Sequence, residues 1–325
     1  MDSLQKNTRI LKAYKIAAAV ISGLLVIASV IAFTLGFEAD IRYFNDSYLS
    51  LPLAIAALAA LSLAVSSLFL FKGTSIDRYP EPLMKFVSML PMIALIRLAI
   101  HAVWSELLRL SQAKIDGIDT AIDLWAVLLL ITAIIASIYN LAEIFSRSKA
   151  LKLVTGLAQI LFCIVTIAKL YVDLSVEINS PIKLIVQFAA ASVILCTLSD
   201  LRQELEIPNA FIFVSSRITS ISLGIVTAVA FFAEILQHAD KYGEDYSIYP
   251  LVFIAYGIKS AVELFPSSFV KSGTSEVCEI IEEMPDEPSD ASSDESGDEA
   301  PVEEAHEVSE ANEAADAEAS ADENR

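Results

Sequence analysis

The chain has 325 residues, of which 55% are hydrophobic and 19% are charged, and its mean hydropathy is +0.58. Soluble domains are about 45–50% apolar and about 25% charged, so this composition excludes an ordinary soluble domain. Of the 41 acidic residues, 20 follow Lys271, where Arg325 is the only base, which leaves 21 acidic and 21 basic residues before that point. The net charge of −19 therefore belongs to the C-terminal segment, and the body of the chain is neutral.

The basic residues are too dispersed for a nucleic-acid-binding protein, because phosphate recognition needs clustered Lys and Arg. The largest cluster comprises Lys6, Arg9, Lys12 and Lys15. We interpret this cluster as a signal for membrane topology, and we expect no nucleic acid among the partners.

Cysteine usage and short motifs give little support for catalysis. Cys163 and Cys196 lie inside apolar runs and Cys278 opens the acidic segment, so neither a disulfide framework nor a cysteine metal site is expected. The sequence contains no HExxH, GxSxG, P-loop or GxGxxG motif. We therefore expect no cofactor, and an enzyme is the least favoured class of function.

Eight apolar segments are long enough to cross a bilayer, which requires about 20 helical residues. In chain order they are 16–37, 48–71, 86–104, 124–141, 153–172, 182–198, 211–236 and 246–265. The last segment is the weakest, because its charge-free stretch ends at Ile258. Pro52, Pro181 and Pro250 lie near the starts of three segments, where a missing N–H is tolerated. The sequence predicts an all-α polytopic membrane helix bundle of about eight transmembrane helices in four hairpins.

The distribution of Lys and Arg predicts the orientation of these segments. The side that carries the N-terminus holds twelve bases, and the opposite side holds six at most. Loops rich in Lys and Arg stay in the cytoplasm. Because eight is an even number, we predict that the N- and C-termini are both cytoplasmic, and we assign the protein to the cell membrane.

We divide the chain into a basic cytoplasmic N-terminus (1–15), a transmembrane helical domain (16–266) and an acidic cytoplasmic tail (267–325). The tail is rich in Ala, Glu, Asp and Ser, and such a composition predicts disorder. One stretch has helical spacing of apolar residues, namely Val277, Ile280, Ile281 and Met284. It is a candidate helix for docking a partner; the alternative is transient helicity, because short isolated helices are marginal.

Ionisable residues inside the apolar segments are candidates for an intramembrane site. Arg97 lies near the middle of the third segment, and His101 follows one turn later. A central Arg costs about 2.5–3.5 kcal/mol in insertion experiments, so it should face the bundle interior and have a partner. Glu234, in the seventh segment, is the most suitable carboxylate. These three residues form either an anion-binding or proton-relay site or a polar cluster that fixes packing, and we favour packing.

A second polar group is predicted at the cytoplasmic ends of the helices. We expect Arg217 to pair with Glu263. Glu143 has Arg147 four residues later, and Glu263 has Lys259 four residues earlier, so each carboxylate has a local partner. These contacts are more plausible as ties between helices than as a ligand site.

Two classes of function remain for a multi-pass membrane protein of this kind. The favoured hypothesis is a membrane-embedded scaffold or sensor, whose acidic tail binds a basic protein partner while the bundle contacts the lipid bilayer. The alternative is a secondary transporter or channel with a polar site around Arg97, His101 and Glu234. Transporters usually contain helices broken by mid-span Gly and Pro, and Pro91 is the only deep proline here.

Overall fold

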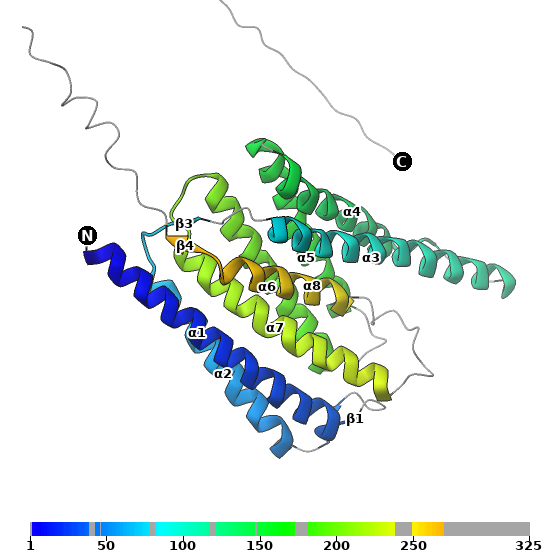
Figure 1. The fold of residues 1–325 in the computed structure, drawn as a ribbon. Coiled ribbons are helices and arrows are strands. Elements are labelled where there is room, and N and C mark those ends of the chain that lie inside the picture. The colour runs from blue at the N-terminus through cyan, green and yellow to red at the C-terminus, as the bar shows by residue number, and fades with distance from the viewer. Residues whose placement is uncertain are drawn as a thin grey trace, which may run out of the picture. The chain divides into compact units, whose positions relative to one another are not determined.

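The computed structural model describes residues 2–38, 43–45, 47–77, 82–117, 121–146, 148–172, 181–237 and 249–269. The chain divides into two compact units, Met1–Ser272 and Gly273–Arg325, and all the described residues belong to the first. Most of them lie in eight helices (Figure 1). The helices are α1 (Asp2–Ile31), α2 (Ser47–Leu70), α3 (Pro82–Ile115), α4 (Leu124–Phe145), α5 (Lys149–Val172), α6 (Pro181–Glu204), α7 (Ala210–Gln237) and α8 (Tyr249–Leu264).

Seven of the described helices, α1 to α7, are long and apolar enough to cross a membrane. The chain is therefore a multi-pass membrane protein, and the predicted all-α helix bundle is confirmed. α8 coincides with the weakest predicted segment and has 16 residues, which corresponds to about 24 Å at 1.5 Å per residue. α3 has 34 residues and continues well beyond its predicted end at Trp104. α1 begins at Asp2, so the basic N-terminal residues continue directly into the first helix.

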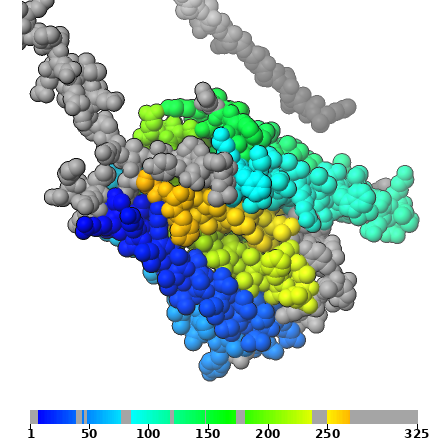
Figure 2. Space-filling view, viewed as in Figure 1, coloured from blue at the N-terminus to red at the C-terminus, as the bar shows by residue number. Residues whose placement is uncertain are grey.

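Helices α3 to α8 form a closed arrangement in which each helix packs against the next along the chain. α8 completes it by packing against α3 as well as α7 and α6. α1 and α2 pack against each other and then together on α7, outside this arrangement (Figure 1). In the space-filling view, α8 is visible between α1 and α3 (Figure 2). The bundle thus consists of a closed arrangement of six helices and an attached hairpin.

Short irregular elements join the helix ends. α1 ends in a π-helical turn (Ala32–Gly36), which leads into β1 (Phe37–Glu38), and β1 pairs with β2 (Tyr43–Phe44). β3 (Ile76–Asp77) follows α2 and pairs with β4 (Ser268–Phe269), which follows α8. Antiparallel pairing of β3 and β4 places the end of α8 beside the loop that follows α2.

Further contacts gather the N-terminal part of α1 and the end of α8 at one end of the bundle. The Lys15 ammonium donates to the carbonyls of Phe265 and Ser267, at 2.8 and 2.6 Å. The Ala210 N–H, at the start of α7, donates to the Thr74 carbonyl at 3.0 Å. We call this the Lys15 end of the bundle. Lys15 of α1, the start of α7 and the residues that follow α8 therefore lie close together at this end.

Candidate functional site

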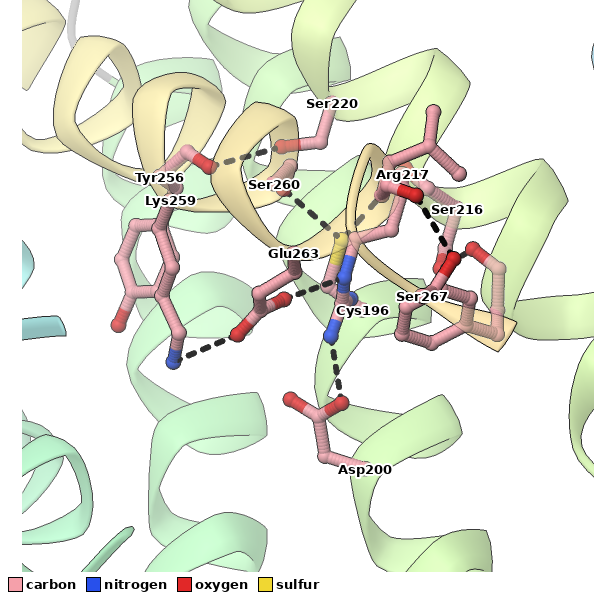
Figure 3. A network of polar contacts seen from close by, with 12 residues as sticks. Cys196, Asp200, Ser216, Arg217, Ser220, Tyr256, Lys259, Ser260, Glu263 and Ser267 are labelled. Carbon is pink, nitrogen blue, oxygen red and sulfur yellow. Dashed lines mark hydrogen bonds and ion pairs between the residues drawn. The ribbon is translucent and has the colours of Figure 1, made fainter. Parts of the chain in front are cut away.

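Arg217 on α7 lies at the centre of a network of charged side chains inside the bundle (Figure 3). Its Nη2 group donates to Asp200 Oδ1 on α6 at 2.6 Å, and its Nε atom lies 2.6 Å from Glu263 Oε2 on α8. The side chains of Arg217, Asp200 and Glu263 are 1%, 8% and 4% exposed. A single guanidinium therefore joins three helices through contacts that are almost completely buried.

Lys259 extends the network to a fourth helix. Its ammonium donates to Glu143 on α4 and lies 3.9 Å from Glu263 on its own helix. The Lys259 side chain is 5% exposed and that of Glu143 is 15% exposed. We use the name ionic network for Glu143, Asp200, Arg217, Lys259 and Glu263.

The position of the ionic network follows from the helix ends. Glu143, Asp200 and Glu263 lie in or next to the last turns of α4, α6 and α8, where a negative charge opposes the helix macrodipole. α7 starts at this same end and runs antiparallel to α6 and α8, and Arg217 lies about two turns after its start. The two cations thus offset both the repulsion among the carboxylates and the unfavourable dipoles.

Hydroxyl, thiol and aromatic groups surround the charges (Figure 3). Cys196 on α6 donates its thiol to the Ser216 carbonyl at 3.5 Å and lies 3.8 Å from the Ser260 hydroxyl. The Tyr139 hydroxyl donates to Asp200 Oδ2 at 3.4 Å. The Arg217 guanidinium lies over the Phe213 ring, 4.9 Å from its centroid, where a cation is attracted to the face of the ring. The charged side chains are therefore surrounded by polar and aromatic groups inside the bundle.

Two further ion pairs, one half-buried and one exposed, lie at the same end, between the start of α5 and the end of α6. Lys152 pairs with Glu204 at 2.8 Å and Lys149 pairs with Glu206 at 2.6 Å. Glu206 follows α6, and the hydrogen bond from Lys149 holds the pKa of its carboxyl below the ordinary value. This end therefore carries a charged rim outside the buried network.

The structure brings together most of the charged residues that the sequence singled out near the ends of the helices. Arg217 and Glu263 form an ion pair, as expected. Glu143 bonds to Lys259 on α8, whereas the sequence favoured a local partner four residues away. That partner, Arg147, lies outside the described residues. Sequence reasoning missed Asp200, although a carboxylate about one turn before the end of α6 was a usable signal.

The group of Arg97, His101 and Glu234 is arranged differently from the expectation. α3 packs on the bundle through Leu95, Leu98 and neighbouring alanines, so Arg97 lies on the outward face and is exposed. The expectation that Arg97 faces the bundle interior therefore does not hold. His101 and Glu234 are half-buried on α3 and α7. α7 is not among the helices against which α3 packs closely.

The remaining predicted site falls outside the part of the chain that the structure describes. It is the candidate docking helix with Val277, Ile280, Ile281 and Met284. Within the described ranges, His, Cys, Asp and Glu form no group of three that could hold a metal ion. A comparison of the chain with family models, with curated proteins and with solved structures finds no match. The functional argument therefore depends on the geometry of the bundle.

Proposed function

We propose that this protein is a membrane-embedded scaffold, a rigid helix bundle whose acidic C-terminal segment binds a basic protein partner. The observation that carries the proposal is the fixation of α8, the helix that leads into that segment. Glu263 and Lys259 tie α8 to α4 and α7 through buried ionic contacts. Lys15 and the pairing of β3 with β4 then hold residues 265–269 at the Lys15 end.

The chemistry of the acidic segment supports a basic partner. Residues 272–325 contain 20 acidic residues and one base, so their attraction to a cluster of Lys and Arg would be strong and sensitive to salt. Anionic lipid headgroups would repel the same segment. We infer that the Lys15 end faces the cytoplasm, in agreement with its excess of basic residues.

A charge-neutral tail provides the sharpest test. One variant replaces the Asp and Glu residues of 272–325 by Asn and Gln at constant length, and a second deletes the segment. Proximity labelling in cells should give a reproducible set of neighbours with basic segments, and both variants should lose that set while retaining membrane insertion. An unchanged set of neighbours in both variants would contradict the scaffold.

A transporter is the second candidate, because buried ionisable residues within a membrane commonly lie on ion or proton pathways. In this interpretation the ionic network, together with His101 and Glu234, would line the pathway. Proteoliposomes that contain the intact protein would show proton flux or solute uptake, and Lys259→Met would abolish it. Flux equal to that of empty liposomes would exclude this candidate for the solutes tested and leave the scaffold as the proposed function.

A further inference from the structure

A group of neutral polar side chains lies one helical turn deeper in the bundle than the pair of Glu143 and Lys259. Asn140 precedes Glu143 by three residues on α4, and Tyr256 precedes Lys259 by three residues on α8. Asn140 Nδ2 donates to the Tyr256 hydroxyl oxygen at 2.9 Å and to the Ala136 carbonyl at 3.0 Å. Two successive polar contacts therefore join α4 and α8: a charged contact near the end of the bundle, and a neutral contact one helical turn further into the bundle.

Gln159 on α5 lies at the level of this neutral contact. A Cβ atom added at Gly156 would lie 3.3 Å from the Tyr139 ring, so residue 156 is level with residue 139. α4 and α5 are antiparallel neighbours, which places Gln159 level with Ala136. The amide of Asn140 reaches the same level because it bonds to the carbonyl of Ala136.

Several atoms of this group have no hydrogen-bond partner among the described residues. They are Asn140 Oδ1, Gln159 Oε1 and Gln159 Nε2. Asn140 and Gln159 are both 0% exposed. Exchanging the oxygen and nitrogen of the Asn140 amide gives no improvement, because the amide oxygen would then face the Ala136 carbonyl oxygen, which is also an acceptor. The Gln159 side chain can bond to Cys163, one turn further along α5, but a thiol is a weak donor and acceptor and does not replace a full hydrogen-bond partner.

We infer that Asn140, Gln159 and Tyr256 bind ordered water inside the bundle. Buried polar groups without partners are costly, and proteins commonly satisfy them with a water that makes about three hydrogen bonds. The orphaned set contains two acceptors, Asn140 Oδ1 and Gln159 Oε1, and the donor Gln159 Nε2. Water both donates and accepts, whereas an anion offers no donor and a metal cation offers no acceptor. The bound water would lie one turn from the Glu143–Lys259 pair.

The substitution Gln159→Leu tests the inference by the sign of its effect. In a dry core, it would remove two unsatisfied atoms at similar volume and would raise the Tm in detergent. If water is bound, the substitution removes a ligand of that water and leaves Asn140 Oδ1 without a hydrogen-bond partner. We therefore expect a lower Tm. The control is Gln187→Leu on α6, because Gln187 is half-buried and its amide donates to the Ile167 carbonyl; its Tm should stay close to that of the unmodified protein. A rise for Gln159→Leu would overturn the inference.

X-ray radiolytic labelling in ¹⁸O water reports the water itself and separates hydration from a packing defect. Oxidation at a buried aromatic ring requires water beside it. We expect ¹⁸O incorporation at Tyr256 in the folded protein and a severalfold loss of it in Gln159→Leu. Phe33, which is 0% exposed within an apolar cluster, is the dry reference. Incorporation at Tyr256 no greater than at Phe33 would contradict a water site.

Discussion

The α1–α2 hairpin and the α4–α8 region hold their helices together by different interactions. α2 buries Ala56, Ala60 and Ala64, at intervals of four residues and with exposures of 8%, 4% and 2%. In the other region, Arg217 and Lys259 join four helices through carboxylates. In lipid, the hydrophobic effect does not drive helices to associate. Helices are instead held together by close packing of small residues or by polar contacts.

This difference has a physical consequence. A contact between small residues depends on shape alone, and each alanine contributes independently. A buried ionic network depends on all its members, because removal of one partner leaves the others charged and desolvated. Substitutions in the hairpin should therefore cause small losses of stability that are confined to the hairpin. Substitutions in the ionic network should cause large losses that also affect the helices packed against α8.

The largest effect is expected for Arg217→Leu, which leaves Asp200 and Glu263 without their shared cation. Loss of one partner from a buried pair costs about 3–5 kcal/mol of unfolding free energy. Denaturant unfolding in mixed micelles measures the change. Arg217→Lys keeps the charge but loses the forked geometry of the guanidinium, so it should give an intermediate loss. An unfolding free energy unchanged by Arg217→Leu would show that the network contributes no net stability.

Gly257→Leu should have the next largest effect, because α7 and α8 touch through backbone at this point. A Cβ atom at residue 257 would lie 2.9 Å from the Gly224 Cα atom. Overpacking of a core typically costs about 1–3 kcal/mol, and contact with backbone places this substitution at the upper end. Gly23→Leu on α1 is the matched control, since nothing lies within 4 Å of a Cβ atom there. Equal thermal stability of the two variants would rule out the close approach.

Ala60→Leu examines the hairpin in the same way and should cost less. Ala60 is 4% exposed and packs within an apolar cluster that includes Leu25, whose side chain can change its rotamer to make room. We expect a loss in the lower part of the range of about 1–3 kcal/mol and no loss for Ala59→Leu, because Ala59 is exposed. Thermal unfolding with a fluorescent reporter on α2 distinguishes the two variants. An equal loss for both would mean that the alanine stripe is not a packing surface.

Glu206→Gln is expected to have the smallest effect, and its sign depends on pH. The pKa of Glu206 is lowered by the hydrogen bond from Lys149. A carboxylate with a depressed pKa in the folded state contributes stability above its unfolded pKa, and this contribution disappears as the pH falls through the folded value. Both partners are mostly exposed, with side chains 61% and 79% exposed, so the contribution is small. The variant should be slightly less stable at neutral pH and equal to the unmodified protein in acid; a difference that grows in acid would contradict the ion pair.

The sequence predicted the helices well, because a lipid environment demands long apolar segments and these are visible without an alignment. It also identified Arg217 and Glu263 as partners, since both lie at the same end of adjacent helices. It misjudged Arg97 because apolar residues occur on all sides of α3. The position of Arg97 along the helix could be predicted from the sequence, but the side of the helix that faces the bundle could not. Asp200 and the bond between Glu143 and Lys259 depend on the order in which helices pack, which local patterns do not encode.

The topology of the bundle is tested most directly by labelling cysteines from each side of a membrane. Ser3→Cys, Ser272→Cys and Lys114→Cys are introduced singly into a variant that lacks Cys163, Cys196 and Cys278, and sealed vesicles are treated with an impermeant maleimide. An even number of crossings predicts that positions 3 and 272 react from the same face and that position 114 reacts from the opposite one. Reaction of positions 3 and 272 from opposite faces would contradict the even number of crossings and the attachment of α8 on which the proposed function depends.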